Sequence, residues 1–266
     1  MKFELSMSLV LALALDASLG IVAAHAQSVA PSAIPKGLFT VNDQDPEANL
    51  PDEDQAAKHP LDWGYLLMSI DERAEEAQKR GDWNAALKYH RAAAKLVPNR
   101  AISHALVCKD YQAVGKRTEA VAACATALSL EGATLDDFVN FVHLVTARPG
   151  ELDSNEVADA ASAIEHLKKE KTSQLAGYEL QCELSLRTRD EQSLADCSKA
   201  LRSLSPSAPR TTSFAWALAL QRHELTLARK LLREARQRGL SRAVLEKMER
   251  ATTAAEKGEA SDSSQR

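Results

Sequence analysis

Apolar residues recur every three or four positions through most of the chain after residue 60, which is the spacing of one face of an α-helix. The first such stripe contains Trp63, Leu67 and Ile70, begins beside Pro60 and stops at Gly81. Proline is tolerated at the start of a helix, and glycine commonly ends one. The pattern therefore predicts an all-α fold over residues 60–257, with short breaks between successive helices.

The segment from Gly81 to Leu128 matches itself after a shift of 34 residues. The matched pairs are Gly81 with Gly115, Ala86 with Ala120, Ala93 with Ala127 and Pro98 with Gly132. Glycine can adopt the positive φ of a tight turn, and alanine lets two helix axes approach to about 8–10 Å. A recurring offset of this length with helical periodicity predicts stacked helix–turn–helix repeats.

These units resemble the tetratricopeptide repeat family, specifically in the first two units and more weakly over the rest of residues 62–240. The resemblance implies a right-handed solenoid of antiparallel helix pairs, with about five pairs and a terminal helix. In that family the first helix of each unit lines a concave groove that holds an extended peptide or a partner helix. The chain is therefore expected to be a non-catalytic protein-interaction module or scaffold.

On this resemblance, the exposed side of the first two such helices would present six residues. The candidates are Met68, Asp71, Glu75, Ile102, Lys109 and Gln112. Some family members hold a partner's C-terminal carboxylate with several lysine and asparagine side chains, and the acids Asp71 and Glu75 contradict that arrangement. The alternative for all six is an ordinary solvated helix face.

Residues 1–26 have the features of a secretory signal peptide. Lys2 precedes an apolar run from Leu9 to Ala24, and Ala24-His25-Ala26 fits a cleavage site that would leave Gln27 first. We expect an exported protein, periplasmic or secreted. The alternative is an uncleaved inner-membrane anchor formed by residues 5–26, which would make the chain a structural subunit of an envelope or secretion complex.

Residues 27–59 contain four prolines and, between Asn42 and Asp54, six acids without a base. Such a segment has little apolar surface to bury, so we expect a disordered tether. An acidic docking strip is the alternative reading. We also expect residues 258–266 to form a disordered tail.

The four cysteines fall on predicted hairpins, with Cys108 and Cys124 in one and Cys182 and Cys197 in another. Turns near Gly115 and Arg189 place the two members of each pair at about the same height. Because an exported chain meets an oxidising compartment, we expect Cys108–Cys124 and Cys182–Cys197 disulfides. The alternative is four buried free thiols.

A zinc site is a further alternative, because His104 and Cys108 share a helical face opposite Cys124. No fourth ligand is apparent, so we expect no metal and no cofactor. The sequence contains no recognisable nucleophile motif, Gly-rich phosphate loop or metalloprotease motif, and we expect no enzyme activity.

The net charge of −4 does not indicate a nucleic-acid-binding protein. Charge is uneven, however, because residues 210–250 carry ten bases and four acids. This basic region could attract an acidic partner, an anionic membrane surface or the acidic tether. We expect a protein or peptide partner, which the sequence does not identify, and peripheral proximity to a membrane.

Overall fold

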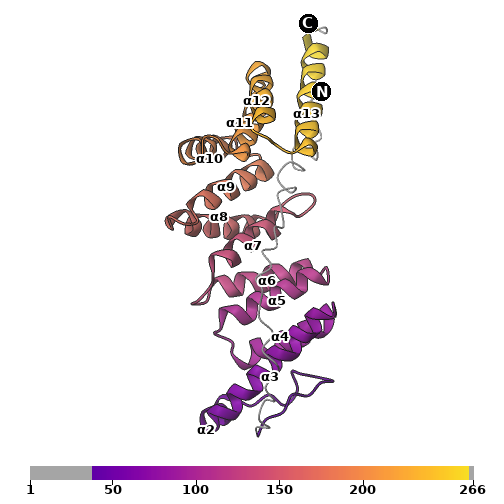
Figure 1. The fold of residues 1–266 in the computed structure, drawn as a ribbon, viewed down its shortest axis with the longest axis vertical. Coiled ribbons are helices and arrows are strands. Elements are labelled where there is room, and N and C mark those ends of the chain that lie inside the picture. Colours follow the sequence, from indigo (N-terminus) through magenta and orange to yellow (C-terminus); the bar gives the residue numbers. More distant parts are fainter. Residues whose placement is uncertain (1–37, 264–266) are drawn as a thin grey trace. The chain divides into compact units, whose positions relative to one another are not determined.

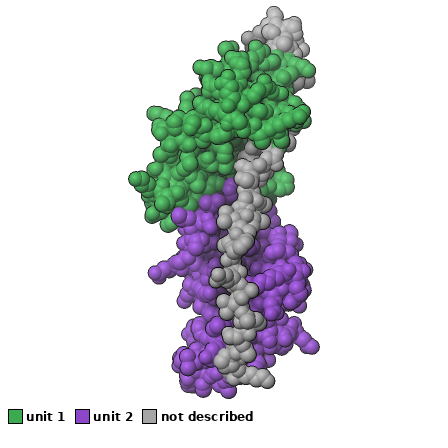
Figure 2. All heavy atoms as spheres, in the orientation of Figure 1, with its two compact units in different colours: residues 1–21, 145–266 green, residues 22–144 purple. Residues whose placement is uncertain are grey.

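The computed structural model describes residues 38–263, and every regular element among them is a helix (Figure 1). These residues form two compact units, an N-terminal unit of residues 38–144 and a C-terminal unit of residues 145–263 (Figure 2). The boundary falls inside α7. The all-α prediction is confirmed for the part of the chain that the structure describes.

The N-terminal unit contains α2 (Glu53–Lys58), α3 (Pro60–Lys79), α4 (Trp83–Leu96), α5 (Ala101–Ala113), α6 (Arg117–Leu128) and most of α7 (Leu135–Thr146). Successive helices pack on one another, α3 on α4, α4 on α5 and α5 on α6. Leu66 and Ile70 of α3 bury against Ala92, Ala93 and Leu96 of α4. From α3 to α6, each helix thus packs on the next one in sequence.

The C-terminal unit contains α8 (Ser154–Lys169), α9 (Gln174–Thr188), α10 (Glu191–Leu204), α11 (Pro209–Gln221), α12 (Leu225–Gln237) and α13 (Arg242–Ser263). Each again packs on the next. Trp216 of α11 is fully buried in this core, and its indole N–H donates to Thr252 Oγ1 of α13 at 3.1 Å. This bond gives the buried indole the partner it needs.

The turn between the two helices of a pair has one geometry in four places. Positive φ occurs at Gly81 (75°), Gly115 (74°), Arg189 (60°) and His223 (57°). The following N–H donates to the carbonyl five residues back, from Asp82 to Ala77, Lys116 to Tyr111, Asp190 to Ser185 and Glu224 to Ala219, at 2.9–3.0 Å. This is the Schellman arrangement, which satisfies the last carbonyls of the first helix.

Arg189 and His223 are also 34 residues apart, the same offset as Gly81 and Gly115. The repeat period therefore continues into the pairs α9/α10 and α11/α12, although neither turn contains a glycine. Close helix contacts are made by small residues, as predicted, with Ala86, Ala120 and Ala228 fully buried. These observations support the predicted succession of helix pairs and are consistent with an α solenoid.

Two predicted details differ from the structure. The apolar spacing over residues 155–169 predicts a helix in which Ala161 faces inward, whereas in α8 Ala160 and Ala163 are buried and Ala161 is exposed. The final helix continues to Ser263 instead of ending before a disordered tail. No proline interrupts it there, and the single Gly258 costs only about 1 kcal/mol in a helix interior.

Residues 38–59 also differ from the predicted disordered tether. Asp52 caps α2 by accepting from the Gln55 N–H at 2.8 Å, while the Gln55 side chain accepts from the Asp52 N–H at 3.1 Å. This reciprocal capping box stabilises the short helix. Residues 38–50 lie against α3 and α4, so the folded part begins at least 22 residues before the expected Pro60.

The predicted signal peptide, residues 1–26, lies outside the described residues, as does the first part of the predicted tether. Within residues 38–263, none of the helices has the length and apolar character required to cross a bilayer.

Candidate protein-binding surface

Two different faces of α3 carry the residues singled out in the sequence. Trp63, Leu67 and Ile70 lie on the face that packs on the core of the N-terminal unit. Met68 and Asp71 project from another face, because residues three or four positions apart lie on the same side of a helix. Met68 is 58% exposed, which is unusual for a large apolar side chain.

An ion pair joins this face of α3 to the start of α5. Arg100, the residue that precedes α5, places Nη1 3.2 Å from Asp71 Oδ2. Ile102, two residues further on, is 42% exposed. The structure therefore brings exposed apolar side chains of α3 and α5 near a neutralised carboxylate.

The other three candidates have different surroundings. Glu75 pairs with Lys79 at 2.9 Å, and its hydrogen bond and charge raise the pKa of Lys79. Gln112 donates to Cys108 Sγ at 3.1 Å, and Lys109 is exposed. Because Asp71 and Glu75 are acidic and already paired, this surface suits an apolar segment better than a free carboxylate.

Both predicted cysteine pairs lie at disulfide distance. Cys108 of α5 faces Cys124 of α6 with their Sγ atoms 1.97 Å apart, and Cys182 of α9 faces Cys197 of α10 at 2.00 Å. All four side chains are buried. Each bond joins the two helices of one pair, which agrees with the pairing expected from hairpin geometry.

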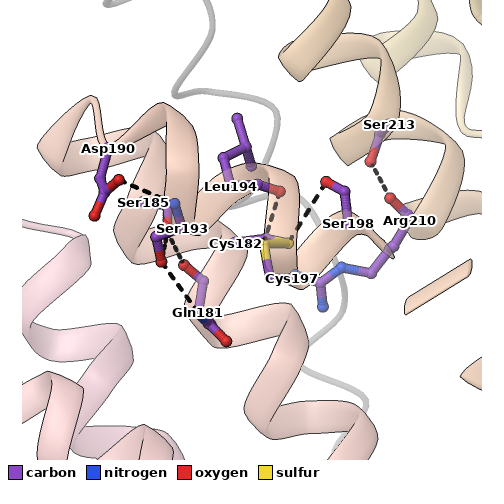
Figure 3. Close-up of a disulfide and its surroundings, with 10 residues drawn as sticks. All are labelled: Gln181, Cys182, Ser185, Asp190, Ser193, Leu194, Cys197, Ser198, Arg210 and Ser213. Carbon is purple, nitrogen blue, oxygen red and sulfur yellow. Dashed lines mark hydrogen bonds between the residues drawn. A yellow bond between two sulfur atoms is a disulfide. The ribbon is translucent and has the colours of Figure 1, made fainter. Parts of the chain in front are cut away.

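A group of hydroxyls accompanies the second disulfide (Figure 3). Ser185 of α9 donates to Ser193 Oγ of α10 at 2.8 Å, and Gln181 donates to the same oxygen at 3.1 Å. Asp190 accepts from the Ser193 N–H at 2.9 Å and so caps α10. These contacts lock the same two helices that the disulfide joins.

The alternative zinc ligands are engaged elsewhere. Cys108 and Cys124 bond to each other, and His104 Nε2 lies 2.8 Å from the Pro98 carbonyl oxygen. Across the described residues, histidine, cysteine and acidic side chains do not gather in threes as a metal ion would require. The zinc alternative therefore has no support in this part of the chain.

A buried polar cluster in the N-terminal unit was not predicted from the sequence. Asp110 of α5 accepts from His90 Nδ1 of α4 at 2.5 Å and from Gln78 Nε2 of α3 at 2.9 Å. The repeat offset contained a signal, because His90 stands 34 residues before the buried Cys124. The equivalent position in the first pair could therefore have been recognised as internal, although His90 was not singled out from the sequence.

Solved structures that resemble this fold include the MamA protein, with a TM-score of 0.56 and 13% identity over 66% of this chain and 92% of that chain. They also include PilF of Pseudomonas aeruginosa, with a TM-score of 0.50 and 13% identity over 73% of this chain and 90% of that chain. Both are tetratricopeptide-repeat proteins, so this chain has a tetratricopeptide-like helical-repeat fold. At such identity the likeness concerns the fold alone. No family model and no curated protein sequence matches the chain.

Proposed function

We propose that this protein is an exported, non-catalytic scaffold that binds a peptide or helix of another envelope protein. The tetratricopeptide-like fold favours a protein partner in general. The binding surface in this proposal is the exposed face of α3 and α5 that carries the six candidate residues.

The observation that carries the proposal is the joint exposure of Met68 and Ile102 on α3 and α5, the first of which is joined to the start of the second by the Asp71–Arg100 ion pair. Large apolar side chains that stay exposed beside ordered polar groups are typical of protein-binding surfaces. A partner helix or extended segment would bury both side chains while the ion pair remains at the edge of the contact.

Export is supported by the two cysteine pairs, because disulfides persist mainly outside the reducing cytosol. The test is direct. Intact mass of the protein from its native host should show a chain that begins at Gln27, and thiol counting without reductant should find no free thiol. An intact N-terminus would instead favour the membrane-anchored alternative.

Site-specific photo-crosslinking tests the surface itself. A photoreactive residue at position 68 or 102 should trap the same envelope protein in living cells. Position 227 provides the matched control, because Leu227 is also a partly exposed apolar residue (41%) but lies on α12 in the C-terminal unit. Equal trapping at all three positions, or no adduct at 68 and 102, would contradict the proposed surface.

A further inference from the structure

Residues 38–50, which we call the strap, run over α3 and α4 without forming a helix (Figure 1). The Leu38 N–H donates to Asp62 Oδ1 at 3.0 Å, and the Phe39 ring meets His59 edge to face at 6.2 Å between centroids. This end of the strap is therefore held beside the start of α3.

The first strap carboxylate contacts both helices. Asp43 Oδ1 lies 2.7 Å from Arg73 Nε of α3, and the Tyr89 hydroxyl of α4 donates to the same oxygen at 3.2 Å. Asp43 therefore sits at a small site made of one cation and one hydroxyl.

A further strap carboxylate, that of Glu47, contacts α4 alone. Glu47 lies 3.0 Å from Arg91 Nη2 and also pairs with Lys95. Arg91 and Lys95 are four residues apart and so share one side of the helix. The face under the strap thus presents three cations, and the strap supplies acids that match them.

Apolar side chains of the strap fill the space between these polar contacts. Phe39, Val41 and Leu50 pack against the core that contains Leu66 and Ile70. Phe39 and Val41 are two residues apart, as expected when alternate side chains of an extended chain face the same surface. The face therefore recognises both charge and apolar surface in an extended segment.

The strap is held loosely compared with a helix of the core. Among its residues only Pro46 is buried, and Asp43 is 63% exposed. Glu47 is 15% exposed, but its partners Arg91 and Lys95 are 46% and 58% exposed. Solvent screens ion pairs as exposed as these, so their net contribution is small. A competing segment could replace the strap without unfolding the helices beneath it.

This face is separate from the surface that carries Met68 and Asp71. Those residues project from a different side of α3 than Leu66 and Ile70, which the strap covers. Binding at one face therefore does not require binding at the other, and the two proposals can fail independently.

We propose that the α3/α4 face under the strap is a second docking site, which binds an acidic segment of a partner protein with apolar side chains two residues apart. The strap is its intramolecular occupant. Arg73, Arg91 and Lys95 recognise the partner's carboxylates, and the apolar core between them accepts its apolar side chains.

A partner must compete with an occupant that is covalently attached. A short tether gives an effective concentration on the order of millimolar. The apparent affinity of a free peptide is reduced by the fraction of molecules whose strap is in place. Weakening the strap should therefore strengthen binding of a free segment.

The experiment uses the full chain and a labelled peptide with the sequence of residues 38–50. Fluorescence anisotropy should show at least tenfold tighter binding to the Asp43→Lys/Glu47→Lys variant than to the wild type. The same peptide with lysine at positions 43 and 47 should not bind. Adding Arg73→Gln and Lys95→Gln to the strap variant removes two cations of the face without attracting the lysine-bearing strap, and it should abolish binding of the unmodified peptide.

Hydrogen exchange of residues 38–50 establishes whether the strap has been released. If the charge variant keeps it protected, Phe39→Ser and Val41→Ser are added to remove its apolar contacts. A released strap without peptide binding, or equal affinity of wild type and released variant, would overturn the proposal. A wild-type dimer that exchanges straps between copies would do so as well, since the occupant would then be a second copy.

Discussion

At the residue scale, Gln78, His90 and Asp110 meet where α3, α4 and α5 pack together. His90 and Asp110 are both buried, and each carboxylate oxygen of Asp110 has a partner. Buried polar groups are tolerated when they are paired in this way. The cluster therefore ties the first helix pair to the second.

Asp110→Ala should lower the free energy of unfolding by about 3 kcal/mol, because it leaves the buried His90 and the partly buried Gln78 without their acceptor. Urea denaturation followed by circular dichroism would measure the loss. Asp136→Ala is the matched control in the same unit, because Asp136 is exposed in the first turn of α7, and we expect a change below about 1 kcal/mol. Equal losses of unfolding free energy in the two variants would contradict a stabilising role for the buried cluster.

Arg189 has a positive φ that a non-glycine residue adopts at a cost of about 1–2 kcal/mol. We therefore expect Arg189→Gly to stabilise the protein by roughly 1 kcal/mol, and Gly115→Ala to destabilise it by a similar amount. Gly64→Ala is the control, because Gly64 lies inside α3 with open space around it and should gain about 0.5–1 kcal/mol. Thermal unfolding of the three variants would test the signs.

The four turns show which backbone conformations can be predicted from single residues of the sequence. Gly81 and Gly115 could be recognised from the sequence because glycine at a fixed offset is a distinctive turn signal. Arg189 and His223 adopt the same backbone conformation without that signal. Their conformation follows from the packing of the flanking helices, which local sequence does not specify.

At the element scale, each cysteine pair joins the two helices of one hairpin. Their separations of 16 and 15 residues could be interpreted in advance because each pair straddles one turn. Which face of α8 is buried could not be predicted, since Ala160, Ala161 and Ala163 are chemically alike and give no periodic signal. Only the packing of neighbouring helices decides which alanine is buried.

Removing a disulfide should destabilise mainly the unit that contains it. Cys108→Ala/Cys124→Ala should lose about 3 kcal/mol in the chain-entropy description. Hydrogen exchange should accelerate across residues 38–144 more than across 145–263, and Cys182→Ala/Cys197→Ala should give the reverse. Equal acceleration of both units in either variant would contradict this expectation.

The strap gives Tyr89 an unusual environment. Burial, and next the charge of Asp43, raise the pKa of Tyr89 above its ordinary value of 10.0. The pKa of Tyr89 is higher in the folded state than in the unfolded chain. The contribution of the neutral hydroxyl to stability is therefore complete below pH 10.0 and is lost as the pH rises through the raised pKa. Strap docking should therefore weaken in strongly alkaline solution.

Asp43→Asn should lower the pKa of Tyr89 towards the ordinary range by removing the adjacent charge. Spectrophotometric titration of tyrosinate would follow the change. Tyr89→Phe identifies the signal, because the high-pH phase should disappear in that variant alone. An unchanged high-pH phase in Asp43→Asn would show that the carboxylate does not act on Tyr89.

At the scale of the whole molecule, helical periodicity and the 34-residue offset were enough to predict successive helix pairs. The strap was not predictable, because its composition is typical of disorder. Its acids meet Arg73 and Arg91, which lie 30 and 44 residues away from Asp43 and Glu47. Such complementarity becomes visible only when the chain is folded.

Each cysteine bonds to a partner within the same hairpin, at most 16 residues away. A polypeptide translocated from its N-terminus would present Cys108 and Cys124 to an oxidising enzyme well before Cys182 emerges. Native cross-linking could then proceed in order along the chain, with little need for an isomerase to correct mismatched bonds. Trapping partly translocated chains with a thiol-blocking reagent should recover the first bond already closed.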